Sequence, residues 1–421
     1  MSSARRPAVG FIFVTLVLDI LGIGLIIPIL PKLIEQLQGG NTAVAAHTVA
    51  LLSFLFAAMQ FVCAPILGCL SDQFGRRPVI LGSLFGAGLD YLLLAWAPTV
   101  PWFFVGRVVA GVSASNLTAA SAYIADISPP EKRAANFGII GAAFGVGFVL
   151  GPVLGGWLGE YSLRLPFLVS AGLVFANWLY GFFVLPESLA LENRGRFSWV
   201  KANPVGSLAF LGRHRLVLRL ALALFLVNMA QFILHNVWVL YTGHRYAWTA
   251  KQVGLSLALV GVLGGLVQAV LARRVVPLLG EGRALLLGIA LGVVSFIGYG
   301  LAPTGLVVCF MLVIGCLGGI GQPATQSLIS GQVGPDEQGA LQGALMSLTS
   351  VAQMIAPLLG GWTLAWGISG RAPIQVSGIP FFVGAALMVV GGLLAWAALK
   401  RLPPKALGKP LVVGVALTSA H

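Results

Sequence analysis

Three charged side chains lie well inside long apolar stretches of this chain, where an ionised group is costly and therefore points to chemistry. Asp19 and Asp90 are the acidic residues in such positions, among only 12 acidic residues in 421, and Arg107 is the basic one. Burying an ionised carboxylate in hydrocarbon costs at least a few kcal/mol, so each acid needs a cationic partner, a wet cavity or a bound proton. Because desolvation favours the protonated form of a carboxyl group, either acid could carry a proton.

Asp90 and Arg107 are expected to meet. A helix rises 1.5 Å per residue, which places Asp90 about 10 Å from the end of its apolar stretch and Arg107 about 9 Å into the next one. An ion pair between consecutive helices follows, either as a fixed structural pair or as a site where the carboxyl group exchanges its proton. Asp19 has no cationic residue near it in the sequence, which favours it as the protonatable group.

The second half of the chain has no acidic residue in the middle of an apolar stretch, and its polar residues there are neutral. Four of them recur at helical spacing on one face of residues 216–241. Such stripes can be interhelical hydrogen bonds worth about 0.6 kcal/mol each, but four on one face favour a cavity lining. His235 could carry a proton or simply pack. The predicted cavity residues are Asn116, Asn228, Gln231, His235, Trp238, Gln268, Gln322 and Gln326.

A charged hairpin, GCLSDQFGRRP, separates two apolar stretches between Gly68 and Pro78. A carboxylate and two arginines at a glycine-flanked turn can form a latch, and a latch suggests a protein that alternates between two shapes, as a transporter must. We expect this latch to hold the outward-facing state. Its predicted members are Gly68, Asp72, Gly75, Arg76, Arg77, Asp126 and Arg133.

Long apolar stretches must position all of these side chains. Of the residues, 58% are hydrophobic and 9% charged, and the mean hydropathy is +0.95, which excludes an ordinary soluble globule. About 20 apolar residues cross about 30 Å of hydrocarbon, where the backbone must be helical. We predict an all-α membrane protein with twelve transmembrane helices. They lie at about 9–30, 47–70, 78–97, 101–126, 135–158, 163–185, 216–241, 251–271, 283–302, 305–330, 340–363 and 376–399.

The net charge of +13 does not indicate nucleic-acid binding, because the basic residues sort by membrane side. If the N-terminus is inside, nearly all of them fall on the inner side, which places both termini in the cytoplasm. The four cysteines are expected to pack as small apolar residues, without a disulfide or a metal site. The chain has no HExxH, GxSxG or Walker A motif, so neither an enzyme nor a cofactor is predicted.

The chain divides into two related halves. GPVLGGW at 151–157 and APLLGGW at 356–362 lie 205 residues apart, and the same offset aligns Pro130 with Pro335 and Gly138 with Gly343. Two parallel six-helix repeats place a substrate site near mid-membrane between them. The predicted parts are an N-terminal six-helix bundle (1–185), a cytoplasmic linker (186–215), a C-terminal six-helix bundle (216–400) and a cytoplasmic tail (401–421).

These motifs resemble the major facilitator superfamily across nearly the whole chain. GCLSDQFGRRPV is similar to its hairpin signature, and DILGIGLIIPILP at 19–31 and GRVVAGV at 106–112 resemble the helix 1 and helix 4 sequences of twelve-span drug–proton antiporters. LDYLLLA, SAYIADIS and EQGALQGALMSLTS are similar to the tetracycline efflux group. GVGFVLGPVLGG at 145–156 resembles the antiporter motif of helix 5, which implies roles for Gly147, Gly151, Pro152, Gly155 and Gly156.

The resemblance also implies which residues handle substrate and protons. Asp19, Asp90, Arg107 and Gln268 stand at positions that those pumps use for one or the other. Tetracycline pumps carry an acidic residue in helix 9 that is needed for proton coupling, and Leu291 stands there. Coupling would therefore rest on the first half of the chain.

By resemblance, the expected function is secondary active efflux in a bacterial inner membrane. A monomer would exchange a lipophilic drug, tetracycline-like or one of many, for protons by alternating access. Two alternatives remain: a facilitator or differently coupled carrier of an organic cation or metabolite, and a membrane sensor that no longer transports. Gly264 replaces a helix 8 histidine of some tetracycline pumps, which bears on the choice of substrate.

Overall fold

The apolar stretches form helices throughout the computed structural model, which describes residues 9–114, 116–195, 197, 208–212, 215–334, 337–369 and 376–401. Twelve helical spans in this part of the chain are long and apolar enough to cross a membrane, as predicted. Several extend beyond the predicted bounds. The longest helix has 33 residues, a length of about 50 Å that exceeds the hydrocarbon core.

The first half of the chain supplies six spans, two of which consist of two helices each. The helices are α1 (Val9–Ile26), α2 (Leu30–Leu37), α3 (Thr42–Phe74), α4 (Arg76–Trp96), α5 (Val100–Ser113), α6 (Asn116–Ile127), α7 (Pro130–Tyr161) and α8 (Leu165–Val184). Here α1 packs against α7 and α8, and α4 packs against α5 and α8. A connection with η1 (Leu191–Asn193) and α9 (Leu208–Leu211) leads to the second half.

The second half repeats this pattern with two further broken spans. Its helices are α10 (Arg215–Tyr246), α11 (Ala250–Leu266), the π-helix η2 (Val267–Leu271), α12 (Ala272–Leu279), α13 (Glu281–Leu301), α14 (Gly305–Leu317), the 3-10 helix η3 (Gly318–Ile320), α15 (Gly321–Ser330), α16 (Gln338–Ile368) and α17 (Ile379–Leu399). The break after Ser113 in the fourth span and the break at Gly318 in the tenth lie at equivalent positions of the two halves, 205 residues apart.

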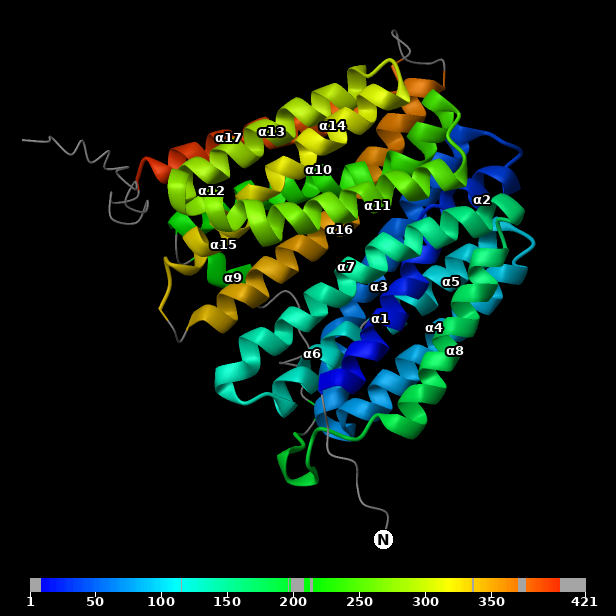
Figure 1. Cartoon of the computed structure of the whole chain (residues 1–421), viewed down its shortest axis with the longest axis vertical. Helices are drawn as coiled ribbons and strands as arrows, with labels where there is room; N and C mark the ends of the chain where they lie inside the picture. The colour runs from blue at the N-terminus through cyan, green and yellow to red at the C-terminus, as the bar shows by residue number, and fades with distance from the viewer. Residues whose placement is uncertain are drawn as a thin grey trace, which may run out of the picture.

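The two halves touch mainly along two pairs of helices, α3 with α16 and α7 with α11. In the second pair, the last residues of α7 meet the first residues of α11, and Gly156 packs on the carbonyl of Ala250. We call the end of the molecule where these residues meet the contact end. The opposite end carries the turn between α3 and α4, and we call it the hairpin end. There α7 diverges from α12 (Figure 1).

Candidate functional site

The predicted intramembrane ion pair is present. Arg107 Nη2 on α5 lies 3.7 Å from Asp90 Oδ2 on α4, and the Asp90 side chain is 1% exposed. Gly106 permits this approach, because a Cβ there would lie 2.6 Å from Asp90 Oδ1. The guanidinium also lies 5.8 Å from the ring centroid of Phe56 on α3, a distance at which a cation and a ring attract. Three spans thus hold one cation beside one buried carboxylate.

The second predicted acid, Asp19, lies half-buried on α1. Tyr91, which follows Asp90 on α4, is 7% exposed and close enough to Asp19, Asp90 and Arg107 for their charges to act on it. Asp19 is therefore not isolated, and it does make a polar or charged interaction of its own. Both acids therefore lie within electrostatic range of one tyrosine in the first half. Its adjacency to Asp90 was visible in the sequence, but its approach to α1 was not.

The neutral polar residues of the second half form hydrogen-bonded pairs between helices. Gln268 in the π-helix η2 donates to Gln322 on α15 over 2.8 Å. Gln326 on α15 donates to Gln342 on α16 over 2.9 Å. Among the described residues, amides from the eighth, tenth and eleventh spans thus point to one another. The first pair joins a π-helix to the second residue after a 3-10 helix, and such irregular turns inside helices are frequent at functional sites.

The four residues on the predicted face of α10 do not share one polar environment. Asn228 donates to Thr349 on α16 over 3.4 Å, Gln231 is half-buried and His235 is exposed. Trp238 is a correction to the predicted cavity lining, since it is 3% exposed and its Nε1 donates to Ser256. It packs among aromatic rings of α13 and α17.

One residue of α10 that the sequence analysis missed connects the two halves. Asn236 Nδ2 donates to Ser53 Oγ on α3 over 2.8 Å. It lies one position beyond His235 and therefore about 100° around the helix from the predicted face. Asn116 begins α6 at the break in the fourth span, but its side chain lies outside the described residues, so its place in the cavity stays a prediction.

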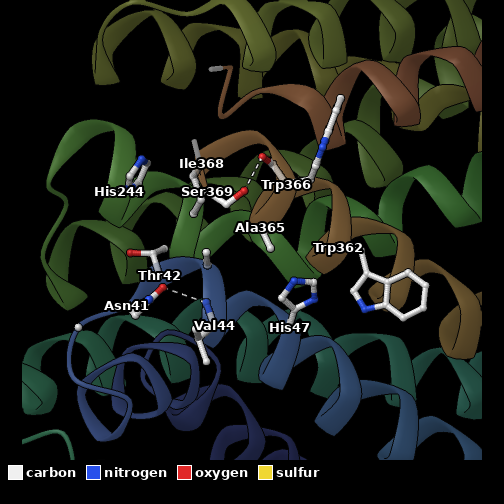
Figure 2. Close-up of a pocket in the computed structure, with 12 residues that line it drawn as sticks. Asn41, Thr42, Val44, His47, His244, Trp362, Ala365, Trp366, Ile368 and Ser369 are labelled. Carbon is white, nitrogen blue, oxygen red and sulfur yellow. Dashed lines mark hydrogen bonds between the residues drawn. The ribbon is translucent and has the colours of Figure 1, made fainter. Parts of the chain in front are cut away.

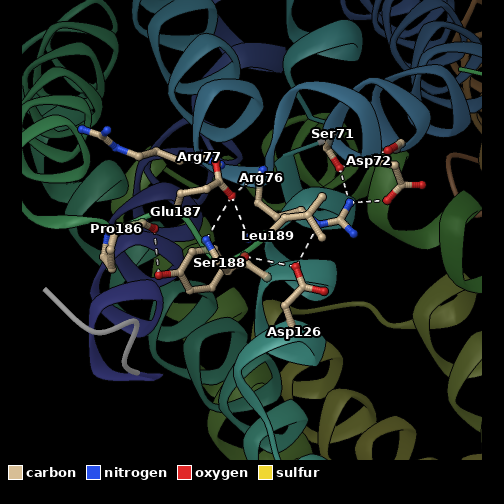
Figure 3. Close-up of polar contacts among 11 residues, drawn as sticks. Ser71, Asp72, Arg76, Arg77, Asp126, Pro186, Glu187, Ser188 and Leu189 are labelled. Atoms are coloured by element: carbon tan, nitrogen blue, oxygen red, sulfur yellow. Dashed lines mark hydrogen bonds and ion pairs between the residues drawn. The ribbon is translucent and has the colours of Figure 1, made fainter. Parts of the chain in front are cut away.

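The hairpin forms a compact ionic cluster around Arg76, shown in Figure 3. Its Nη1 donates to Asp72 Oδ1 over 2.5 Å and to Ser71 Oγ over 2.7 Å, and its Nε donates to Asp126 Oδ2 over 3.0 Å. Gly75 has φ 108°, a left-handed conformation that favours glycine and allows α4 to start at Arg76. Arg76, at the start of the third span, thus binds residues at the ends of the second and fourth spans.

The latch contains a member that the sequence analysis placed in the linker. Glu187 accepts hydrogen bonds from the backbone N–H groups of Arg76, Arg77, Ser188 and Leu189. A carboxylate at the first turn of a helix satisfies free N–H groups and interacts favourably with the helix dipole. Glu187 thereby caps the start of α4 and ties the chain after α8 to the hairpin (Figure 3).

The remaining predicted latch residues have different surroundings. Ser188 Oγ donates to Asp126, which it shares with Arg76. Arg77 meets no carboxylate through its described side-chain contacts, and it donates instead to the carbonyl of Phe182 and lies over that ring. A Cβ at Gly68 would lie 3.6 Å from Thr118. The side chain of Arg133 lies outside the described residues. The described members of the latch come from the first half and, through Glu187, from the segment that follows it. The hold of the latch on the outward-facing state stays a prediction.

The glycines of the predicted antiporter motif pack α7 against two different neighbours. Cβ atoms at Gly147, Gly151 and Gly155 would lie within 3 Å of α1, the last only 2.0 Å from the carbonyl of Leu25. Gly156, on the next face, packs across the two halves against Ala250, and the carbonyl of Pro152 packs against Gly254 of α11. The motif therefore packs α7 tightly against α1 in its own half and allows α7 to approach α11 of the other half closely.

The duplication reproduces this arrangement in the second half. Gly360, 205 residues after Gly155, packs on α10 within its own half, and Gly361 packs across the halves against the carbonyl of Ala46 on α3. The two inter-half contacts are therefore equivalent pairs, α7 with α11 and α16 with α3. Such backbone approaches require small residues because lipid supplies no hydrophobic drive between helices.

The family model for the Major Facilitator Superfamily matches residues 12–357. The chain belongs to the major facilitator superfamily. It is 39% identical over 376 residues to the tetracycline resistance protein, class C, of Escherichia coli, covering 89% of this chain and 93% of that protein. It is 28% identical over 387 residues to multidrug resistance protein 2 of Bacillus subtilis, covering 88% and 91%. Together with the class H and class B relatives, these similarities place it in the tetracycline-efflux-like branch.

A solved relative has the same fold. The crystal structure of the human organic anion transporter MFSD10 (TETRAN) matches with a TM-score of 0.67 and 27% identity, covering 93% of this chain and all of that one. The protein is accordingly a multi-pass inner-membrane transporter of the drug-efflux type and not an enzyme. Among the described residues, no group of three or more His, Cys, Asp or Glu side chains could hold a metal ion.

The two departures from tetracycline pumps have different surroundings here. Leu291 on α13 lies beside Gly318, at the 3-10 break of the tenth span. A Cβ at Gly264 on α11 would meet nothing within 4 Å, so a larger side chain has room there. The first position is filled by a packing residue, whereas the second leaves open space near Gln268.

Proposed function

We propose that the protein exports a lipophilic drug, tetracycline-like or one of several, in exchange for protons by alternating access. The observation that carries this proposal is the ion pair of Asp90 with Arg107 and the neighbouring Asp19, with both acids within electrostatic range of Tyr91. A carboxylate 1% exposed, with a cation 3.7 Å away and no hydrogen bond to it from the described residues, is well suited to gain and lose a proton as that cation shifts.

The proposed topology places the hairpin end in the cytoplasm, together with both termini. This topology is supported by the excess of basic residues in the loops of the hairpin end, because cytoplasmic loops of membrane proteins carry more Lys and Arg than outer loops. The contact end then faces outward. A closed outer end with diverging inner ends is the arrangement expected of an inward-facing state, in which substrate enters from the cytoplasm.

In this scheme the bundles 1–185 and 216–400 move as two bodies, joined by the segment 186–215, and a monomer suffices. Substrate contacts the amides Gln268, Gln322 and Gln326 with His235 and Asn228 in the second half, while protons use the first. Neutral amides and an exposed imidazole suit an uncharged or zwitterionic lipophilic molecule better than a simple cation, because the described spans of the second half have no acidic residue in their middle.

The test is release of tetracycline and of a panel of fluorescent drugs from proteoliposomes with an imposed pH gradient. Wild type is compared with Asp19→Asn and Asp90→Asn, and with Glu35→Gln as a change at a third carboxylate. Gradient-driven movement abolished by either asparagine, and kept in Glu35→Gln, is the expected result. Movement that ignores the gradient would instead identify a facilitator, and no movement of any tested drug would overturn drug efflux.

A further inference from the structure

The contact end carries a group of polar side chains that the transport residues do not include. Lys32 on α2 donates through Nζ to the carbonyl of Trp248 over 2.5 Å. Glu160, at the end of α7, accepts a hydrogen bond from the backbone N–H of Lys251 over 3.3 Å and bonds the side chain of Thr249. Lys32 and Glu160 belong to the first half, and all three of their partners belong to the second.

Each of these two side chains meets a backbone group of opposite charge. Ala250 is the first residue of α11, so Glu160 lies at the positive end of a 17-residue helix whose first N–H groups lack helical partners. Lys32 meets a carbonyl, which carries the opposite partial charge. Lys32 is attracted electrostatically by Glu35 of its own helix and by Glu160. One cation and one anion of the first half thus hold two backbone groups of the second.

The segment that receives them is held in a defined shape. Ala247 has φ 54°, a left-handed conformation that a non-glycine residue adopts at a cost. The Trp248 N–H donates to the carbonyl of Thr242, and Thr249 caps α11 in a capping box with Gln252. The loop therefore presents the Trp248 carbonyl and the start of α11 as a preformed surface.

The equivalent pair of helices, α3 and α16, has different surroundings at the contact end. There, α3 and α16 are bordered by a pocket of about 790 Å³, lined among others by Asn41, Thr42, His47, His244 and Ser369 (Figure 2). No Asp, Glu, Lys or Arg is among the lining residues. The charged contacts of Lys32 and Glu160 lie on the α7–α11 side, whereas the hydrogen bond from Asn236 to Ser53, which joins the halves at α3, is between neutral side chains.

We propose that Lys32 and Glu160 form an outer clasp, which holds the two halves together at the contact end and must open in each transport cycle. The clasp rests on the proposed function in one respect, the assignment of the contact end to the outer side of the membrane. It does not depend on the identity of the substrate or on proton exchange. The clasp stabilises the state seen here, whereas the Arg76 latch lies at the hairpin end and is predicted to hold the opposite state.

The test measures distances between spin labels on opposite halves, in a chain without its native cysteines. One pair, on Gln36 and Arg245, reports the contact end, and a second pair, on Leu191 and Gln332, reports the hairpin end. The variants are Glu160→Gln and Lys32→Met, which remove one charge each. The matched control is Arg164→Met, because Arg164 also donates to backbone carbonyls at this end, but to those of Ala95 and Ala97 in its own half.

Each clasp variant should increase the population of molecules that have a long contact-end distance and a short hairpin-end distance, relative to the state seen here, by about tenfold. This is the change expected when one charge-assisted hydrogen bond is lost. Arg164→Met should match wild type. Unchanged distances in both clasp variants, or an equal shift in Arg164→Met, would overturn the clasp. The distances do not depend on proton-driven export, so a shift without such export would keep the clasp and reject the proposed coupling.

Discussion

Three glycines of one motif on α7 should respond to the same substitution in three different ways. A Cβ at Gly145 meets nothing within 4 Å, one at Gly155 lies 2.0 Å from the carbonyl of Leu25 in the same half, and one at Gly156 lies 2.5 Å from the carbonyl of Ala250 in the other half. We therefore expect Gly145→Ala to be neutral, Gly155→Ala to destabilise the fold, and Gly156→Ala to shift the balance between the two states.

The magnitude for Gly156→Ala follows from the atoms that it meets. Ordinary contact begins at 3.4 Å, so α7 and α11 must separate by about 0.9 Å, a gap that forfeits up to about half of the local dispersion energy. Both partners are backbone, which has no rotamer to change, so the cost falls within the range of about 1–3 kcal/mol for overpacking. At roughly 2 kcal/mol the ratio of molecules with an open contact end to molecules with a closed contact end rises about thirtyfold.

The assay combines thermal unfolding with label distances across the contact end. Gly155→Ala should lower the melting temperature and leave the distances of the folded fraction unchanged. Gly156→Ala should lengthen the contact-end distance with a smaller loss of melting temperature. The reasoning fails if Gly156→Ala behaves as Gly145→Ala does, or if it lowers the melting temperature as far as Gly155→Ala without any change in distance.

The remaining predictions concern the charged and amide pairs. Asp90→Asn should abolish proton-driven transport and destabilise the protein by about 3–5 kcal/mol, because it leaves Arg107 buried without its counter-ion; adding Arg107→Gln should restore the melting temperature but not transport. Asp72→Asn should slow transport far more than it weakens drug binding, and equal losses in kinetic and binding assays would contradict its gating role. Gln322→Leu should weaken drug binding, measured by fluorescence titration, while proton uptake stays intact, because it leaves Gln268 without its partner.

Features governed by composition and helical geometry could be predicted from the sequence. The twelve spans follow from the apolar stretches, and the Asp90–Arg107 pair follows from equal depth in consecutive helices. The Asp72–Arg76 contact follows from their spacing, since residues four apart across a tight turn lie close together. In each case the partners are near in the chain or are constrained to one depth by the membrane.

Features that depend on contacts distant in the chain could not be predicted. Glu187 binds N–H groups at Arg76 and Arg77, 111 and 110 residues away, and backbone donors leave no pattern in a sequence. Trp238 shares a helical face with His235, but a long helix meets different neighbours along its length, and near its end that face meets aromatic rings of α13 and α17. The π-helix around Gln268 also had no signature among its residues.

The neighbouring positions of Gly155 and Gly156 restrict how the two halves can move. Residues next to each other on a helix point about 100° apart, so α7 is locked to α1 on one side while it contacts α11 on the other. Bending α7 to break the second contact would also disturb the first, where the backbones already touch. The contact end should therefore open with α7 and α1 moving together as one body. Any local bending should be concentrated at the breaks in the spans, after Ser113 in the first half and at η2 and η3 in the second.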